Sequence, residues 1–265
     1  MSARRGRFVP TALAVVGVSA LVLLIGVPLL ALLVRAPWGD ALDVLTDPAV
    51  REALGLSVIV SLWALFLAVV LGFPIAWVLA RVSFPGRALV RSLVLLPMVV
   101  PPVIGGVALL VAFGRRGVVG QHLDDWFDIR LAYTRTAAVL AATFVSLPFF
   151  VITVEAALRG VDRRYEDAAR SLGASPGFVL RHVTLPSIKG ALGAGAALAW
   201  ARALGEFGAT ITFAGSFAGQ TQTMPLAIYD LLDTDVHVAI LLSLVLLAVS
   251  VAVLALLRGR WLGAP

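Results

Sequence analysis

The chain has 265 residues, of which 60% are hydrophobic and only 14% charged, and its formal net charge is +6. A soluble globular chain has roughly 45–50% apolar and 25% charged residues, because it must cover its surface with polar side chains. The composition therefore excludes a soluble enzyme and predicts an all-α integral membrane protein. There is no cysteine, which excludes a disulfide scaffold. The three histidines lie far apart, which argues against a zinc or haem site.

Long apolar runs predict six transmembrane helices, because a span needs about 20 apolar residues to cross the bilayer. The runs cover residues 12–34, 53–80, 92–114, 136–154, 190–214 and 238–257. The first is too long for the apolar region of a signal peptide and is interpreted as a retained span. The fifth is the least regular, because it must carry Arg202 and Glu206.

The distribution of Lys and Arg predicts how the chain is oriented in the cell (plasma or inner) membrane. Six spans place both termini on one side, which then carries 14 basic residues and three acids, against six basic residues and ten acids on the other. We therefore expect both termini to be cytoplasmic. The basic residues are spread over four short segments beside the membrane, so they indicate topology rather than binding of nucleic acid.

The longest cytoplasmic loop, residues 159–189, is predicted to contain two small helices. Asp162 can cap the first, and Gly173 stands where a helix C-terminus favours glycine. Ser175, followed by a proline, can begin the second, which we expect to end before Pro186. An ordered loop of this kind suggests a docking surface for another protein. The pattern alone also allows a simple link between two spans.

The same loop resembles the EAA motif of ABC importer permeases, which reads Glu-Ala-Ala, three residues, Gly, nine residues and Ile-x-Leu-Pro. Both gaps match, with aspartate in place of the glutamate and valine in place of the isoleucine. The resemblance implies a coupling helix that sits in a cleft of a cytoplasmic ABC ATPase subunit. The residues that it assigns to ATPase coupling, including the glutamate directly before the motif, are Glu166, Asp167, Ala168, Ala169, Gly173, Val183, Leu185 and Pro186.

The resemblance also implies the type 1 (MetI-like) ABC importer permease architecture. The five-helix core would cover residues 53–257, after a segment 1–52 that holds the cytoplasmic N-terminus, the first span and an outer loop. A cytoplasmic tail, 258–265, would follow. The chain has no Gly-x4-Gly-Lys-Ser/Thr phosphate-binding loop. We therefore expect no cofactor, metal or catalytic residue in this chain, with ATP and Mg²⁺ bound by the partner ATPase.

Two charges in the fifth run need an explanation, because a charge within a span is costly unless it is paired or faces a cavity. Arg202 and Glu206 are four residues apart, so on a helix they lie on one face and can pair. Two interpretations stay open: a structural pair, or residues that line or gate a pathway. The uncharged stretch that follows is rich in Gly, Thr and Gln, which can offer N–H and hydroxyl donors to an oxyanion.

This stretch, with Thr-Gln-Thr-Met-Pro at 221–225, closely resembles molybdate ABC transporter permeases. Prolines in the third run support the match. They are expected to kink or break the helix, which lipid tolerates only where protein or a water-filled cavity meets the freed backbone groups. An ordinary proline kink is the alternative. The residues assigned to a translocation pathway are Pro101, Pro102, Gly105, Arg202, Gly205, Glu206, Phe207, Gly208, Thr210 and Thr212.

The resemblance implies a permease subunit that imports molybdate and works as a homodimer in the lipid bilayer. Two cytoplasmic ABC ATPase subunits and an extracytoplasmic molybdate-binding protein would be its partners. Sulfate permeases share the Gly-Glu-Phe-Gly core, so tungstate or sulfate remains an alternative cargo. A secondary transporter would leave the cytoplasmic motif unexplained. A membrane-embedded enzyme would need convergent titratable groups, and only Glu155, Arg202 and Glu206 qualify.

Overall fold

The computed structural model describes residues 8–261 and is helical over most of that length. The α-helices are α1 Phe8–Leu21, α2 Val27–Arg35, α3 Ala41–Thr46, α4 Pro48–Arg81, α5 Arg87–Val99, α6 Pro102–Phe113, α7 Gly120–Phe127, α8 Arg135–Gly160, α9 Arg163–Ser171, α10 Pro176–Val179, α11 Leu185–Ser187, α12 Lys189–Leu204, α13 Gly208–Phe213, α14 Met224–Leu231 and α15 Val236–Trp261. The described residues also form π-helical turns η1 Val22–Gly26 and η3 Leu180–Thr184, and a 3₁₀ turn η2 Trp38–Asp40. The basic residues expected at positions 4, 5 and 7, and the end of the tail, lie outside the described residues.

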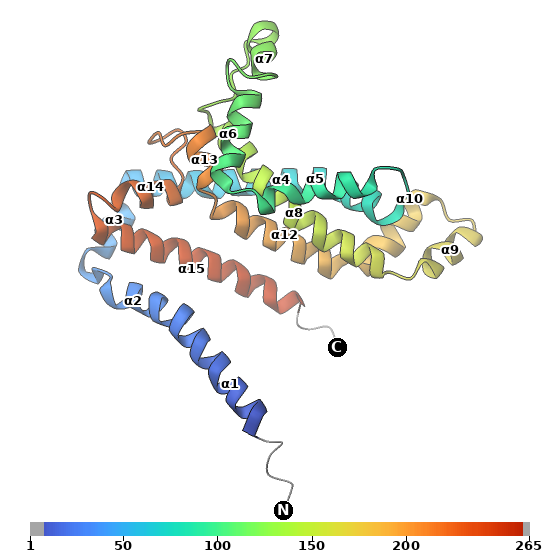
Figure 1. Ribbon diagram of the computed structural model, residues 1–265, viewed down its shortest axis with the longest axis horizontal. Helices are drawn as coiled ribbons and strands as arrows, with labels where there is room; N and C mark the ends of the chain where they lie inside the picture. The colour runs from blue at the N-terminus through green and yellow to red at the C-terminus, as the bar shows by residue number, and fades with distance from the viewer. Residues whose placement is uncertain (1–7, 262–265) are drawn as a thin grey trace, which may run out of the picture.

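The core of the molecule is a layer in which α4, α8 and α12 pack against one another (Figure 1). Small side chains dominate the contact between α4 and α8, and Ala64, Ala68, Ala138 and Ala141 have no exposed surface. Small residues let helix backbones approach closely, which is how helices associate where lipid surrounds them. Both long helices begin at a side-chain cap, provided by Asp47 for α4 and by Thr134 for α8.

The first apolar run forms one continuous helix through α1, η1 and α2, which diverges from the core layer (Figure 1). Its membrane-spanning part, Leu13–Arg35, has a mean hydropathy of 2.7 and no buried residue. The π-helical turn η1 ends two residues before Pro28. A widened turn relieves the clash that a proline ring makes with the carbonyl four residues earlier. This helix therefore presents an apolar surface on all sides.

Within the described residues, three helices are long and apolar enough to span a membrane alone: Leu13–Arg35, Pro48–Arg81 and Arg135–Gly160. The third predicted run is instead divided into α5 and α6, whose axes differ by 117° across a short break. Pro101 and Pro102 lie at this break, as expected of residues that cannot continue the backbone hydrogen bonds of a helix.

The prediction of one continuous fifth helix over 190–214 is wrong. The helix α12 ends at Leu204, and α13 begins only at Gly208. Between them, a carboxylate oxygen of Glu206 accepts the N–H of Ala209 at 2.7 Å. A side chain that bonds a nearby backbone N–H offers an alternative to the helical ladder, and the chain turns here. The sixth run forms α15, which starts where Asp235 accepts two backbone N–H groups.

The two small helices of the loop 159–189 begin as predicted. Asp162 caps α9 by accepting the N–H of Arg164, and Ser175 caps α10. Gly173 follows α9 with φ of 88°, a left-handed conformation that glycine adopts without strain. The prediction that the second helix ends before Pro186 is wrong, because the helix continues through η3 and α11. The widened π-helical turn η3 accommodates the proline without ending the helix.

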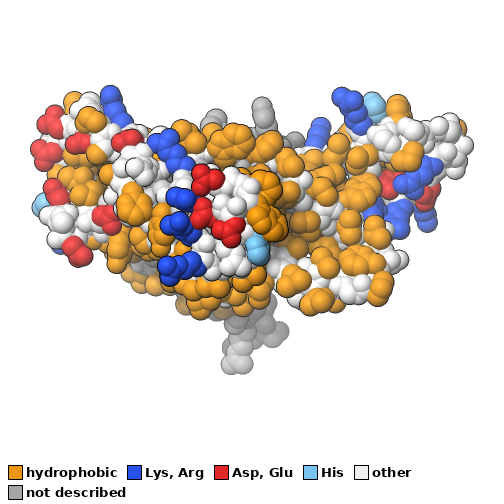
Figure 2. Space-filling model, turned by 90° about the horizontal axis from the view of Figure 1, so that it is seen from above, with side chains coloured by type: hydrophobic (Ala, Val, Ile, Leu, Met, Phe, Trp, Pro, Cys, Tyr) orange, Lys and Arg blue, Asp and Glu red, His pale blue; other side chains and the backbone are white. Residues whose placement is uncertain are grey.

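Charged residues gather at the two ends of the molecule. Acidic side chains cluster at the end formed by α3 and α14, and basic side chains dominate the end formed by α9 and α10 (Figures 1 and 2). A third group of mixed charge lies over α7, at the tip of an arm that α6 raises from the core layer (Figures 1 and 2). The molecule thus has distinct acidic and basic ends, joined by apolar helices.

Candidate functional site

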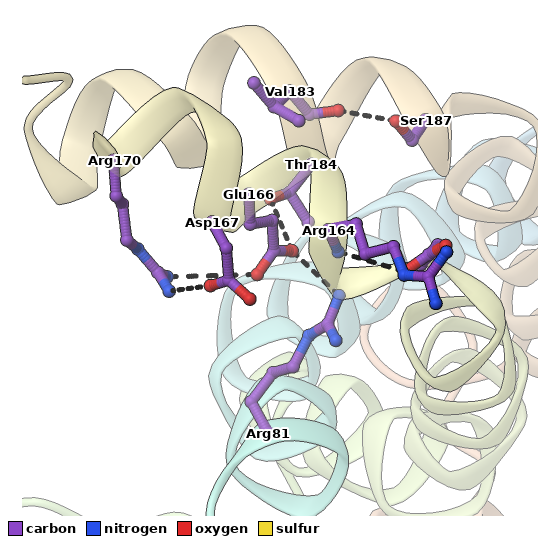
Figure 3. Close-up of polar contacts among 9 residues, drawn as sticks. Arg81, Arg164, Glu166, Asp167, Arg170, Val183, Thr184 and Ser187 are labelled. Carbon is purple, nitrogen blue, oxygen red and sulfur yellow. Dashed lines mark hydrogen bonds and ion pairs between the residues drawn. The ribbon is translucent and has the colours of Figure 1, made fainter. Parts of the chain in front are cut away.

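The residues assigned to ATPase coupling lie at the basic end of the molecule, on α9, η3 and α11 and, for Gly173, in the turn after α9. Glu166 is 3% exposed, although it belongs to a connecting segment between spans. Its Oε1 accepts a hydrogen bond from Arg81 Nη2 at 2.7 Å and another from Thr184 Oγ1 at 3.0 Å (Figure 3). One carboxylate therefore joins α9 to the end of α4 and to η3, so the two halves of the motif meet.

The remaining coupling residues divide between an outward and an inward side. Asp167 is exposed and pairs with Arg170, with 3.3 Å between the closest charged atoms. Ala168, Gly173 and Pro186 are exposed as well, whereas Ala169, Val183 and Leu185 are half-buried. The sequence did not distinguish the inward Glu166 from the outward Asp167. It also missed Arg81 and Thr184, which hold Glu166 in place.

Apolar side chains surround the outward face of this segment. Tyr165, Leu172 and Phe178 are 68%, 89% and 51% exposed. An open groove of about 380 Å³ lies beside them, and its lining includes His182 and Pro186. Exposed apolar groups next to charged ones are typical of protein–protein contact sites. We define this face, formed by α9, α10, η3 and α11, as the coupling surface.

Arg202 and Glu206 form the predicted ion pair, with 2.7 Å between Arg202 Nη1 and Glu206 Oε2. The Glu206 carboxylate is 3% exposed and also caps the start of α13 through the N–H of Ala209. Its position across the break between α12 and α13 favours the structural interpretation for Glu206. The Arg202 side chain is 27% exposed, so it is the accessible member of the pair.

Residues assigned to the pathway from the third and fifth runs meet where α6 packs on α13. A Cβ added to Gly208 would lie 2.9 Å from Pro102 Cβ. A Cβ added to Gly106 would overlap the hydroxyl of Thr212 and lie 2.7 Å from the carbonyl oxygen of Ala209. The sequence missed Gly106, which allows the closest approach between the two helices. Contact between backbones explains why glycine is needed here.

The other pathway assignments occupy different surroundings. Gly105 is buried beside Phe144, and Thr210 is buried in α13. The Thr212 hydroxyl contacts the carbonyl oxygens of Gly208 and Ala209, at 3.0 and 3.1 Å, so its proton is directed into its own helix. Phe207 is half-buried, with its ring centroid 4.9 Å from that of Tyr229, while Pro101 and Gly205 are exposed.

The loop after α13 is fastened to three helices at the acidic end of the molecule. Asp230 of α14 accepts hydrogen bonds from Ser216 and Gln222, at 2.7 and 2.8 Å. Arg135 of α8 donates to the carbonyl of Gly219 at 2.7 Å, and Ser57 of α4 accepts the N–H that begins α14. The Thr-Gln-Thr-Met-Pro segment is therefore held in one conformation. These partners are distant in the chain, and no local pattern predicts them.

Two further clusters of charge lie outside these sites. Glu155 and Arg159 form the expected pair four residues apart, at 2.6 Å. On the raised arm, hydrogen bonds from Arg130 and Arg115 hold the pKa of Asp124 below its usual value. Across the described part of the chain, no three His, Asp or Glu side chains are grouped as metal ligands.

Broken apolar helices around a small-residue core, with an ordered connecting segment at one end, form the fold of a helical membrane protein. The same fold occurs in solved ABC importers. A bacterial alginate ABC transporter, crystallised with an alginate-bound periplasmic protein, matches with a TM-score of 0.77 and 15% identity, over 93% of this chain and 91% of that one. The MetNI methionine ABC transporter matches with a TM-score of 0.54 and 21% identity, over 80% and 94%.

The family described as "Binding-protein-dependent transport system inner membrane component" matches residues 68–262, and the chain belongs to this family. The molybdenum transport system permease protein ModB of Mycobacterium tuberculosis is 46% identical over 234 residues, or 88% of each chain. ModB of Escherichia coli K12 is 43% identical over 83% of this chain and 95% of that protein. The sulfate permease CysT of Salmonella typhimurium is 38% identical over 82% and 78%. The chain is thus a multi-pass membrane transport component and not an enzyme.

Proposed function

We propose that this chain is the membrane-spanning permease subunit of an ATP-driven importer that moves molybdate into the cytoplasm. The observation that carries the proposal is the similarity to ModB proteins, which extends over 88% of both chains at 46% identity. The coupling surface supports the ATP-driven part, because it offers an ordered, partly apolar contact site at one end of the molecule. A sulfate importer is the second candidate, because CysT is 38% identical over 82% of the chain.

In this proposal the chain crosses the membrane six times, with both termini and the coupling surface in the cytoplasm. The third crossing is formed by α5 and α6, and the fifth by α12 and α13. The excess of basic residues at the end that carries α9 and α10 supports this orientation. The permease core covers residues 53–257, between the segment 1–52 and the tail 258–265.

The proposed assembly is a homodimer of this chain with two ABC ATPase subunits on the coupling surfaces. The ATPases bind ATP and Mg²⁺, and this chain binds no cofactor. An extracytoplasmic molybdate-binding protein docks at the acidic end. The pathway runs between the two copies, and ATP binding draws the coupling surfaces together so that the spans rock from inward-facing to outward-facing.

The assigned pathway residues take different roles in this mechanism. Arg202 attracts the molybdate dianion, and its ion pair with the buried Glu206 neutralises part of its charge, so that the anion is not tightly trapped. Backbone and side-chain groups of α6 and α13 form the wall, with Gly106 and Gly208 keeping the two helices in contact. A wall without a full countercharge suits an anion that must bind and then leave.

The proposal is tested by a competition experiment with the assembled complex in lipid vesicles. Molybdate uptake should require ATP, and equal concentrations of tungstate should inhibit it far more than sulfate does. Stronger inhibition by sulfate would assign the chain to the sulfate branch. Uptake that follows an ion gradient and ignores ATP would identify a secondary transporter instead.

A further inference from the structure

A buried ion pair joins the coupling surface to the end of α4, in addition to the chain connections to α8 and α12. Arg81 occupies the last turn of α4, and its side chain is 9% exposed, whereas that of Glu166 is 4% exposed. Their closest atoms are 2.7 Å apart, although the two residues are 85 positions apart in the chain. A charge-assisted hydrogen bond between buried groups is short and directional. The pair therefore fixes where α9 stands relative to α4.

Glu166 also holds the two parts of the coupling surface, α9 and η3, together. Its Oε1 accepts a hydrogen bond from the hydroxyl of Thr184, which is fully buried on η3. Arg170 approaches the other carboxylate oxygen at 3.8 Å from the solvent side. Figure 3 shows Arg81 reaching this carboxylate from α4, on the side opposite Thr184. Movement of either α9 or η3 is thus transmitted to the same carboxylate.

The end of α4 that carries Arg81 is itself held firmly. Arg87 at the start of α5 and Arg159 at the end of α8 both donate to the carbonyl oxygen of Leu79. Leu79 is fully buried in the core cluster that α4 shares with α8. A displacement that reaches Arg81 therefore acts on the packed core and not on a loosely held helix end.

We propose that Arg81 is a positioning residue for energy coupling, which transmits movement of the coupling surface to α4 through Glu166. This inference rests on the proposed function, because it assigns a route to the ATP-driven movement. Without the pair, α9 remains joined to α8 through residues 161–162 and to η3 through Thr184, but it loses its charged contact with α4. The ATPase would then move α9 without moving α4 by the same amount.

Three variants and one matched control test the role of the pair. Glu166→Gln keeps the shape and can still accept from Thr184, but it removes the negative charge. Arg81→Met removes the cation, and Arg81→Lys retains it. The control is Glu155→Gln, which neutralises another buried glutamate at the same end of the molecule. Glu155 pairs with Arg159 of its own helix and with Arg91 of α5, so its loss leaves α9 attached.

The experiment uses the complete complex in vesicles and measures ATP hydrolysed and molybdate taken up in the same sample. We expect Glu166→Gln and Arg81→Met to hydrolyse ATP but to import about tenfold less molybdate per ATP, a typical size for coupling between sites. Arg81→Lys should import nearly as much molybdate per ATP as the wild type. The control should change the yield of complex and leave the ratio unaltered. A wild-type ratio in Glu166→Gln, or an equal fall in the control, would overturn the proposal.

A second readout separates this inference from the identity of the cargo. An environment-sensitive fluorophore on Ala218→Cys, an exposed site in the loop after α13, reports movement at the opposite end of the molecule. ATP should change its fluorescence in the otherwise unaltered complex and much less with Glu166→Gln. Complexes that show this difference but import no molybdate would contradict the proposed function alone. An equal fluorescence change in both would contradict the role of Arg81.

Discussion

The contact between α6 and α13 gives a specific prediction, because replacing one hydrogen atom of Gly106 by a methyl group would make the two helices overlap. In Gly106→Ala the added methyl group would overlap the Thr212 hydroxyl and lie 2.7 and 2.8 Å from the carbonyl oxygen and Cα of Ala209. Real Cβ atoms do not approach backbone this closely, and backbone cannot rotate away as a side chain can. The two helices must therefore separate at this point.

The expected loss of stability follows from the cost of inserting a methyl group into a packed contact, about 1–3 kcal/mol. Removing the Thr212 hydroxyl should recover only part of it, because Ala209 remains in the way. We therefore expect Gly106→Ala to lower the melting temperature of the complex and to impair uptake. The double variant Gly106→Ala with Thr212→Ala should have a melting temperature between that of Gly106→Ala and that of the wild type.

Gly55→Ala is the matched control, since a Cβ there meets no atom within 4 Å. It should be neutral or stabilising by up to about 1 kcal/mol, the difference in helix propensity between the two residues. Thermal unfolding and uptake are measured for all variants in the same lipid. If Gly106→Ala melts and transports like Gly55→Ala, the close approach of α6 and α13 is absent in the functioning protein.

Three further predictions address topology, coupling and the raised arm. A membrane-impermeant thiol reagent should label Asp233→Cys and spare Ser175→Cys in intact cells; the reverse pattern would invert the proposed orientation. Gly173→Val forces a branched side chain into a left-handed conformation, so it should weaken association with the ATPase and abolish uptake, which co-purification and vesicle assays would detect. Asp124→Asn should destabilise the fold at neutral pH. Because Arg130 and Arg115 lower the pKa of Asp124 in the folded state, its stabilising effect is complete above the unfolded pKa of about 3.9 and is lost as the pH falls through the lower folded value. Melting curves of the two proteins should therefore converge in acid, and a constant difference at all pH values would contradict this cause.

Local features were predictable from the sequence because their causes lie within a few residues. The caps at Asp162 and Ser175 and the left-handed Gly173 need only neighbouring backbone groups. The Arg202–Glu206 pair also forms as predicted, although Glu206 lies just beyond the end of α12 and not on its helical face. The apolar composition and the fixed gaps of the cytoplasmic motif were enough to indicate the fold and the family.

Other features were not predictable, because they depend on a partner far away in the chain or on a choice between competing local hydrogen bonds. Arg81 at the end of an apolar helix is typical of a residue that marks the cytoplasmic side, and its partner lies 85 positions away. The break after α12 arises because Glu206 caps α13, a choice that hydropathy does not reveal. Continuation of the second small helix past Pro186 requires the π-helical turn η3, and no residue pattern predicts that turn.

The most direct test of the account measures molybdate accumulation in vesicles that enclose ATP and contain this chain with its ATPase. The molybdate-binding protein is supplied outside. We predict accumulation against a concentration gradient, which stops when the ATPase subunit or ATP is omitted. Equal accumulation by vesicles that contain this chain without the ATPase would contradict the central claim that the coupling surface delivers the energy for import.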